Sequence, residues 1–323
     1  MKVTLDLSQL LHDGKISQPE FDKFSALSAQ ATGSLAFNIL IGFGVMAVSV
    51  GAVALVPTPL TAVVVGAAVF AFGLLLTFTR SEQWSLLAQI CLIAGALIFA
   101  GGIIAIDDGS LRAFVLVTAV FTVASIAARS GLLMVAAVLA LASCIGASTG
   151  YWHATYELSI TEPTFTIVLF SLLAFGTYQL SKRLPPDYEG LALMAARTSV
   201  FLVNFGFWIG SLWGDSLSPL RSSGDAAAAA GGAAAPIVLP PLLFSIGWAL
   251  ALAATGIWAV RAGRRWVINV VAVFAAIHFY TQWFDALGPT PLSFLVGGLV
   301  MLVFAFALWT FNRRYAGKAP QAA

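Results

Sequence analysis

Charged residues are scarce in this sequence. They make up 9% of its 323 residues, whereas 60% are hydrophobic and the mean hydropathy is +0.94. Soluble domains carry about 25% charged residues, so the composition excludes an ordinary water-soluble globule. The net charge is only +2, and no basic stripe is interleaved with aromatic residues. The sequence therefore predicts no nucleic-acid partner.

Residues that bind metals or form disulfides are equally few. The two cysteines, Cys91 and Cys144, fall inside apolar runs, where they read as small hydrophobic residues and not as a disulfide framework. The three histidines stand at positions 12, 153 and 278, without the spacing of metal ligands. We therefore predict no metal site and no cofactor.

Long apolar runs dominate what remains. A membrane-spanning helix needs about 20 predominantly apolar residues, and ten runs reach or approach that length. They predict an all-α, polytopic transmembrane bundle of about ten spans, and the lipid bilayer as its solvent. The runs lie near residues 35–56, 58–79, 84–106, 111–128, 130–149, 164–181, 190–213, 237–260, 264–283 and 291–311.

These runs divide the chain into three parts. Residues 1–34 are predicted to form a cytoplasmic helical hairpin, 35–311 the transmembrane domain, and 312–323 a cytoplasmic tail. Residues 214–236, rich in Ser, Ala and Gly, read as a flexible outer loop. The polar start predicts no cleavable signal peptide, so the first apolar run would be an uncleaved anchor.

The distribution of Lys and Arg predicts the orientation. With ten spans and a cytoplasmic N-terminus, Arg112 and Arg221 fall outside and Arg197 falls within a span, whereas the rest of the 16 basic residues lie inside. Positive charge collects in cytoplasmic loops, so both termini are expected in the cytoplasm. Tryptophans favour the membrane interface, and seven of the nine lie near predicted span ends: Trp84, Trp152, Trp213, Trp258, Trp266, Trp283 and Trp309.

The N-terminal stretch carries the signature of a water-soluble hairpin. Ser17 and Glu20 have the spacing of a capping box at a helix start. Gly14 stands where a preceding helix, near residues 5–13, would end in a left-handed cap. Two interpretations stay open: a cap lying against the membrane face, or a module for docking or self-association.

A resemblance follows from these residues. The pattern L-x-x-L-L-x-D-G-x-I-S-x-x-E-F, residues 7–21, resembles the short hairpin of the SHOCT type found beside many bacterial membrane spans. With the Gly-rich runs NILIGFGVMAVSVGAVAL and AGALIFAGGIIA, the chain also resembles a bacterial family of predicted multi-span membrane proteins that has no assigned activity. The resemblance implies an integral protein of a bacterial inner membrane and supplies no catalytic residues.

The run 190–213 carries two opposite faces. Arg197, Asn204 and Ser211 recur every seven residues and share one helix face. Gly206, Gly210 and Gly214 recur every four on roughly the opposite face, where glycine allows a second helix to approach. Two interpretations of Arg197 stay open. Its side chain has a structural role, reaching the headgroups or pairing with another residue, or it contacts an anionic solute inside the membrane.

The run 264–283 and its outer end carry a second polar group. His278, Thr281, Gln282 and Asp285 share one face near the predicted outer surface. They form either an interfacial belt or a proton-transfer or gating site, which Asp215 could join if the two helices were neighbours.

One catalytic motif occurs by letter. Residues 146–150, GASTG, spell the G-x-S-x-G of a serine nucleophile, but that motif requires a strand before it and a helix after it. Here it closes an apolar run, so we interpret it as small-residue helix packing and predict that the protein is not an enzyme.

Two functional classes remain. The first is a structural or interaction protein of the membrane, with residues 1–34 binding a protein partner or a second copy. The second is a secondary transporter of a small solute, with an anion as one option. Five plus five spans would give the inverted halves of such transporters, although residues 35–149 and 163–311 share no convincing similarity.

Overall fold

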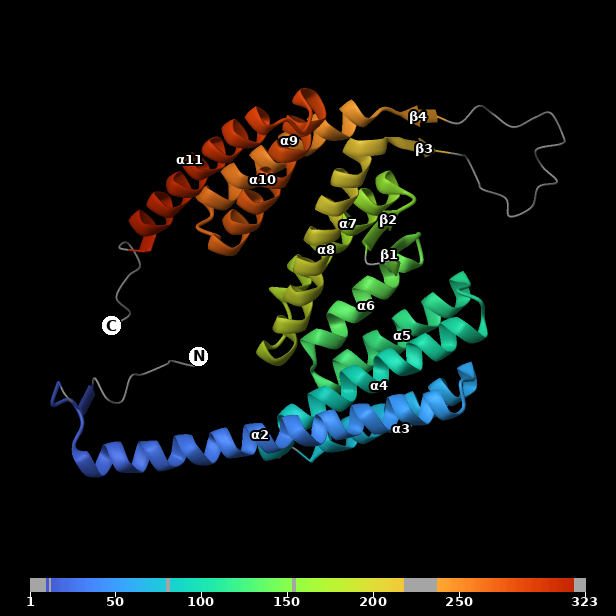
Figure 1. Ribbon diagram of the computed structural model, residues 1–323, viewed down its shortest axis with the longest axis vertical. Helices are drawn as coiled ribbons and strands as arrows, with labels where there is room; N and C mark the ends of the chain where they lie inside the picture. The colour runs from blue at the N-terminus through green and yellow to red at the C-terminus, as the bar shows by residue number, and fades with distance from the viewer. Residues whose placement is uncertain (1–9, 12, 80–81, 153–154, 218–236, 317–323) are drawn as a thin grey trace. The chain divides into compact units, whose positions relative to one another are not determined.

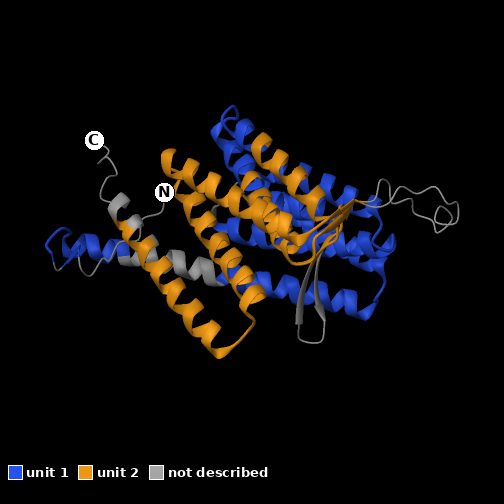
Figure 2. Ribbon diagram, turned by 90° about the horizontal axis from the view of Figure 1, so that it is seen from above, with its two compact units in different colours: residues 1–144, 177–195 blue, residues 145–176, 196–323 orange. Residues whose placement is uncertain are grey.

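The chain is described by a computed structural model covering residues 10–11, 13–79, 82–152, 155–217 and 237–316. It divides into two compact units (Figure 2). Unit 1 comprises residues 1–144 and 177–195, and unit 2 comprises residues 145–176 and 196–323.

Helices make up most of both units (Figure 1). In chain order the elements are α2 (Gln18–Leu55), α3 (Pro59–Phe78), the 3-10 turn η1 (Glu82–Trp84), α4 (Ser85–Ile106), α5 (Leu111–Ala128), α6 (Gly131–Ser143), β1 (Ala147–Trp152), β2 (Thr155–Ile160), α7 (Pro163–Ser181), α8 (Pro186–Trp213), β3 (Asp215–Leu217), β4 (Ile237–Leu239), α9 (Pro241–Arg261), α10 (Arg265–Leu287) and α11 (Pro291–Ala316). A helix therefore occupies most of each predicted run.

Proline and hydroxyl side chains set the helix starts. Proline is the first residue of α3, α7, α8, α9 and α11, a position where its missing N–H removes no helical hydrogen bond. Hydroxyl side chains also cap helix starts: Thr58, before α3, accepts from the Thr61 N–H at 3.2 Å, and Ser110, before α5, accepts from the Ala113 N–H at 3.3 Å. Local sequence thus separates apolar runs that hydropathy alone would merge.

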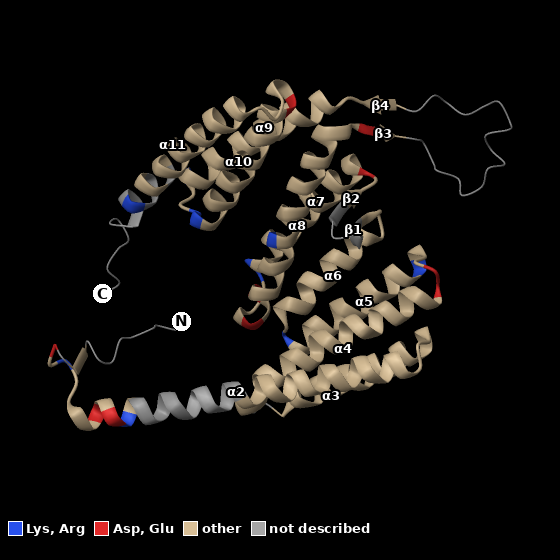
Figure 3. Cartoon of the chain, viewed as in Figure 1, with Lys and Arg blue, Asp and Glu red and all other residues tan. Residues whose placement is uncertain are grey.

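Eight helices in the described part of the chain are long and apolar enough to cross a membrane. They are α3, α4, α5, α7, α8, α9, α10 and the segment Phe37–Leu55 of α2. This supports the assignment as a membrane-spanning helical protein, and the charged residues lie mainly toward helix ends (Figure 3). The count of ten spans is not confirmed, because α6 and the apolar segment Pro291–Ala307 of α11 are shorter.

The predicted span 130–149 is wrong in its second half. The helix α6 ends at Ser143 after 13 residues, about 20 Å, against a hydrocarbon core of about 30 Å. Gly146 then takes a left-handed φ of 85°, and β1 pairs antiparallel with β2, Ala147 opposite Ile160. The start of the predicted span 237–260 is also a strand: β4 pairs antiparallel with β3. Both strands continue an apolar run, so hydropathy did not distinguish them from helix.

The helix α2 is continuous across the predicted boundary at residue 34. It has 38 residues and a length of about 57 Å, whereas its apolar segment Phe37–Leu55 has only 19 residues. The remaining 19 residues, 18–36, extend the same helix by about 28 Å. The second arm of the predicted hairpin is therefore an extension of the first span.

Unit 1 is built on a seam of glycines between α3 and α4. Glycines spaced by seven residues on each helix leave no room for side chains where the backbones meet: a carbon added at Gly73 would lie 2.6 Å from the Leu92 N, and one at Gly102 2.7 Å from the Val63 N. The antiparallel register of this glycine seam is Gly66 opposite Phe99, Gly73 opposite Leu92, Gly95 opposite Phe70 and Gly102 opposite Val63. Direct backbone contact of this kind replaces hydrophobic burial as the source of helix association in lipid.

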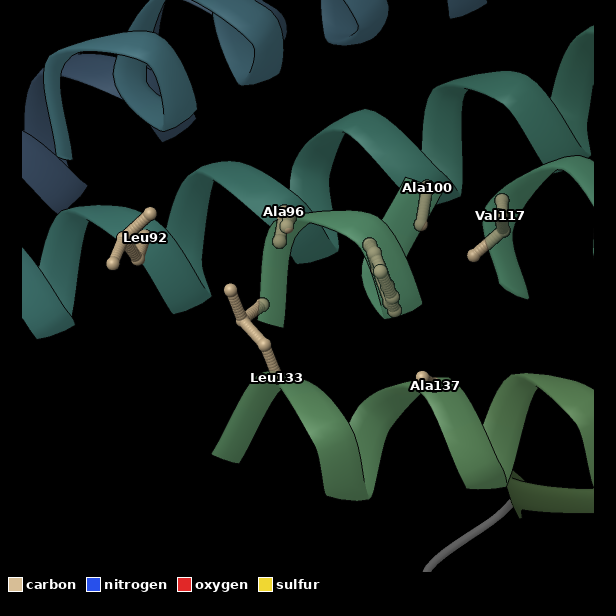
Figure 4. Packing of buried hydrophobic residues seen from close by; sticks show 8 residues of the cluster. Leu92, Ala96, Ala100, Val117, Leu133 and Ala137 are labelled. Atoms are coloured by element: carbon tan, nitrogen blue, oxygen red, sulfur yellow. The ribbon is translucent and has the colours of Figure 1, made fainter. Parts of the chain in front are cut away.

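The other faces of unit 1 use small and branched side chains. Leu92, Ala96 and Ala100 of α4 pack with Val117 and Phe121 of α5 and with Leu133 and Ala137 of α6, all at most 6% exposed (Figure 4). Helix α4 therefore contacts α3 through glycine on one side and α5 and α6 through this cluster on another. Its central position explains why nine of its 22 residues are buried.

Unit 2 has an aromatic core. Trp248 and Leu252 of α9 pack with Val270 and Phe274 of α10, and Trp248 is completely buried. The Phe274 ring lies 5.7 Å from the rings of both Phe201 and Phe205 on α8, in edge-on geometry. Such aromatic pairs contribute about 0.5–1.5 kcal/mol beyond area burial, so large interlocking rings hold these three helices.

The glycine seam makes a prediction that two adjacent residues can test. Gly102→Ala places a methyl group against the α3 backbone and should destabilise the protein by about 1–3 kcal/mol. Gly101→Ala is the matched control: its added carbon has nothing within 4 Å, and alanine favours helix by up to about 1 kcal/mol. Denaturant unfolding of the purified protein in detergent measures both. Equal effects of the two substitutions would contradict the seam.

Candidate functional site

The polar face of α8 lies within the helix packing of unit 2. Asn204 and Ser211 are buried, at 8% and 6% exposure, and Arg197 is half-buried. The Ser211 hydroxyl donates to the Trp208 carbonyl of its own helix at 2.7 Å. Each of the other two residues contacts a different neighbouring helix.

Arg197 contacts the first turn of α10. Its guanidinium carbon lies 5.1 Å from the centre of the Trp266 ring, a cation–π distance. Trp266 is the second residue of α10, whereas α8 is 28 residues, about 42 Å, long and exceeds the hydrocarbon core by about 12 Å. The contact therefore supports a position for the Arg197 side chain near the headgroups, where an arginine and a tryptophan both have access to water.

Asn204 forms a buried hydrogen bond between α8 and α9. The Trp248 indole N–H donates to the Asn204 Oδ1 at 2.9 Å, and the Asn204 amide donates to the Val200 carbonyl at 2.8 Å. Both atoms of the side-chain amide are thus paired. Interhelical bonds of this type contribute about 0.6 kcal/mol on average, and at most about 1.7, so this bond orients two helices more than it holds them together.

His278 joins the same cluster from α10. Its ring meets the Trp248 ring edge-on with centres 4.9 Å apart. Its buried Nδ1 has no hydrogen-bond partner among the described residues. The structure therefore gathers Asn204, Trp248 and His278 from α8, α9 and α10, and we call these three residues the Trp248 cluster.

The remaining residues predicted on α10 do not join this cluster. Gln282 is half-buried and Asp285 is exposed. The Thr281 hydroxyl donates to the Ile277 carbonyl, one turn earlier in α10, at 2.8 Å. The same hydroxyl accepts from the indole N–H of Trp208 on α8 at 3.0 Å. A second tryptophan thus links α8 to α10 in the same way that Trp248 links α9 to α8.

Asp215 caps a helix and does not meet His278. Its carboxylate is buried, at 8% exposure, and accepts from the Thr164 N–H in the first turn of α7 at 2.9 Å. A carboxylate at this end of a helix is stabilised by the helix dipole. Among the described residues, Asp215 is hydrogen-bonded to neither His278 nor Asp285, so the three-residue site that the sequence suggested is not assembled.

The sequence pattern does not identify the tryptophans of these contacts as site residues. Trp208 and Trp248 are the two of the nine tryptophans that lie away from predicted span ends. A tryptophan inside a span needs a partner for its indole N–H, and that rule is the signal that could have identified both. The seven-residue spacing identifies Asn204 as a candidate, but it does not identify its partner Trp248.

A small cavity adjoins the Trp248 cluster. It has a volume of about 220 Å³ and is lined by Ser171, Asn204, Trp248 and Thr255 together with apolar residues of α7 to α10. Sites for drug-sized ligands measure about 300–1,000 Å³. The cavity is therefore small for a solute with a hydration shell, and no charged residue lines it.

The three glycines of α8 contact different elements. A carbon added at Gly206 would meet Ile167 of α7 at 3.0 Å, and one at Gly210 would meet the Phe244 ring of α9. Gly214 follows the last helical residue with a φ of 73° and lies against the Leu239 carbonyl of β4. The structure therefore places the first two in packing contacts with two separate helices, and the third in a turn.

The N-terminal turn has the local geometry that its sequence predicts. The Ser17 N–H and hydroxyl both donate to the Glu20 carboxylate at 2.8 Å, which forms one half of the capping box. Gly14 has a φ of 66°, and the Lys15 N–H bonds the Leu10 carbonyl at 2.9 Å while the Gly14 N–H bonds the Leu11 carbonyl at 3.0 Å. This pair of bonds is the Schellman ending of a helix. The first predicted arm, residues 5–13, lies largely outside the described residues.

The G-x-S-x-G motif does not lie in a helix. Gly146 is in the turn before β1, and residues 147–150 belong to β1, which leads into β2. Our interpretation of this motif as helix packing is wrong. A nucleophile elbow joins a strand to a helix, whereas here a strand leads to a strand.

Comparison with known proteins adds no family. No family model matches the chain, and neither curated proteins nor solved structures give a match. The resemblance to the SHOCT-type hairpin and to the family of multi-span proteins therefore stays a prediction.

The bond between Trp248 and Asn204 can be tested by a double-mutant cycle. Trp248→Phe leaves the buried Asn204 Oδ1 without its donor, and Asn204→Leu leaves the indole N–H without its acceptor. We expect the pair of substitutions to destabilise less than the sum of the two, by about 0.6–1.7 kcal/mol. Trp258→Phe, at an exposed position of α9, is the control and should be close to neutral. Strict additivity in unfolding measurements would show that the bond contributes nothing.

The capping box predicts a pH dependence at the start of α2. Hydrogen bonds from the Ser17 backbone N–H, and then from its hydroxyl, lower the pKa of Glu20 below its ordinary value. The local stability they provide is present at neutral pH and is lost as the pH falls from the ordinary pKa of a glutamate through the lowered value. Hydrogen exchange of residues 13–24, followed by mass spectrometry, should show this loss. Glu20→Gln, which has no charge to lose, should remove the pH dependence.

Proposed function

We propose that this chain is an integral protein of a bacterial inner membrane, with both termini in the cytoplasm. In this proposal the N-terminal hairpin docks a protein partner or a second copy of the chain. The helices of membrane-spanning length support the membrane location, and the excess of Lys and Arg in alternate loops supports the orientation. The bacterial origin rests on the resemblance of residues 7–21.

The continuity of α2 is the observation that best supports the docking role. Beyond its apolar segment the helix extends by about 28 Å without a break. Phe21 at its start is half-buried, whereas Asp22, Lys23 and Phe24 are exposed. A module at the end of a continuous helix holds its partner at a fixed distance from the bilayer, and a force on the partner reaches the first span directly. A cap lying flat on the membrane surface would not require such an extension.

The transporter alternative receives less support from the geometry. Arg197 contacts Trp266 at a helix end, and the cavity beside Asn204 is small and uncharged. The polar residues of α8 and α10 pair with tryptophans in the helix packing. We therefore assign the polar face of α8 to helix association.

The docking role predicts a crosslink at the start of α2. A photoreactive amino acid in place of Phe24, which is 44% exposed, should form a protein adduct in intact cells. Gly14→Val should abolish that adduct: the position has open space around it, but its φ of 66° disfavours a β-branched residue, so only the turn is lost. Gly44→Val, at a helical position of α2 with equally open surroundings, is the matched control.

Two outcomes would count against the proposal. An adduct that persists unchanged in Gly14→Val would show that docking does not use the hairpin. Labelling of Phe24→Cys by a membrane-impermeant maleimide in unbroken cells would place the hairpin outside the cell. The native cysteines, one buried and one half-buried, give the background, which the unsubstituted protein measures.

A further inference from the structure

An apolar groove separates α10 from α11 in unit 2. The two helices are joined near the loop that connects them, where the Trp283 indole N–H donates to the Ser293 carbonyl at 3.1 Å and Gly297 lies against the Trp283 ring. Farther from the loop the groove has a volume of about 540 Å³. Its walls include Ile268, Ala272, Ala276 and Phe279 of α10, and Phe304 and Ala305 of α11. All of these side chains are apolar.

One end of this groove is basic. Helix α9 ends at Arg261, α10 begins at Arg265 and the antiparallel α11 ends at Ala316, so these three ends lie at the same side of the helices. Arg261, Arg264 and Arg313 are exposed there, and Figure 3 marks basic residues at the ends of these helices. The single acidic residue of 241–316 is Asp285, at the opposite end of α10.

The arginines lie close to the groove along each helix. Val260 lines the groove and is followed directly by Arg261, and Ile268 lies one turn after Arg264. On α11, Arg313 is six residues, about 9 Å, beyond the lining residue Ala307. Arg313 also contacts the Trp309 ring at 5.3 Å, an aromatic–cation pair of the type that occupies the headgroup level. An apolar channel thus opens toward a cluster of exposed positive charges.

We propose that this groove binds an anionic phospholipid, with an acyl chain along the alanines of α10 and α11 and the phosphate at Arg261, Arg264 and Arg313. Basic pockets between membrane helices recognise anionic headgroups through charge, and the apolar walls match a hydrocarbon chain. The site goes beyond the docking role of the hairpin and does not depend on it.

Charge also argues against a second copy of the chain as the occupant. A copy in the same membrane orientation would bring its own arginine-rich helix ends to the same level, next to Arg261, Arg264 and Arg313. Like charges at that distance repel in a medium of reduced dielectric constant. An anionic lipid supplies the opposite charge, and a zwitterionic lipid supplies no net charge.

Native mass spectrometry of the full-length protein in detergent tests the site. The protein is titrated with phosphatidylglycerol or with phosphatidylcholine of identical acyl chains. We expect tighter retention of phosphatidylglycerol, and each arginine near the headgroup should contribute about fivefold in affinity. The double substitution Arg261→Gln and Arg264→Gln should therefore lower phosphatidylglycerol affinity by about 25-fold. Arg112→Gln, an exposed arginine of α5, is the control and should change nothing.

The groove itself is tested by filling it. Ala305→Trp, at an exposed lining position, should weaken the binding of both lipids, whereas Val303→Trp, at an exposed position of α11 outside the lining, should not. Equal retention of the two lipids by the unsubstituted protein would overturn the proposal. The proposal would also be overturned if Ala305→Trp left lipid binding intact, or if soluble glycerol phosphate, which has no acyl chain, competed fully with the lipid. A lipid-free dimer that Ala305→Trp dissociates would assign the groove to a second copy instead.

Discussion

The close approach of α3 and α4 is the contact on which unit 1 depends. In lipid, apolar side chains gain little by leaving one hydrocarbon environment for another, so helices associate where their backbones can touch over a long distance. Glycines at intervals of seven on both helices provide that surface over about three turns. Because α4 is fixed to α3 on this side, its opposite side chains can form the cluster with α5 and α6. The remaining helices of the unit arrange around a pair whose separation the glycines set.

In unit 2, large side chains and not glycines hold the helices together. Trp248, Phe274, Phe201 and Phe205 interlock across α8, α9 and α10, and two indole N–H groups bond Asn204 and Thr281 on neighbouring helices. In hydrocarbon a polar atom without a partner is unfavourable, so each such bond permits only a narrow range of helix rotations. These polar residues therefore fix the rotation of one helix relative to the next. That role accounts for Asn204 and Thr281 without a solute.

The ends of the helices differ from their middles in chemistry and in consequence. At one end of α9, α10 and α11, arginines gather around the opening of an apolar groove, and at the start of α2 an exposed capped turn stands on a continuous helix. If the proposed docking and lipid binding occur, both would take place at the membrane boundary and not in its interior. A lipid held at α10 and α11 would also fill the space that protein side chains leave open between these two helices.

The apolar composition, most helix positions and the turn at Gly14 and Ser17 could all be predicted from the residues alone. These follow from local properties: hydropathy over about 20 residues, proline and hydroxyl residues at helix starts, and a glycine that can adopt a left-handed φ. Local pattern failed where strands continued apolar runs, at 147–152 and 237–239, because hydropathy does not distinguish strand from helix over so few residues. The contacts of Arg197 with Trp266, of Asn204 with Trp248 and of Asp215 with the start of α7 are visible only in the three-dimensional fold. Each of those contacts joins residues far apart in the chain, and which helices become neighbours depends on the fit of whole surfaces, which no single run of residues encodes.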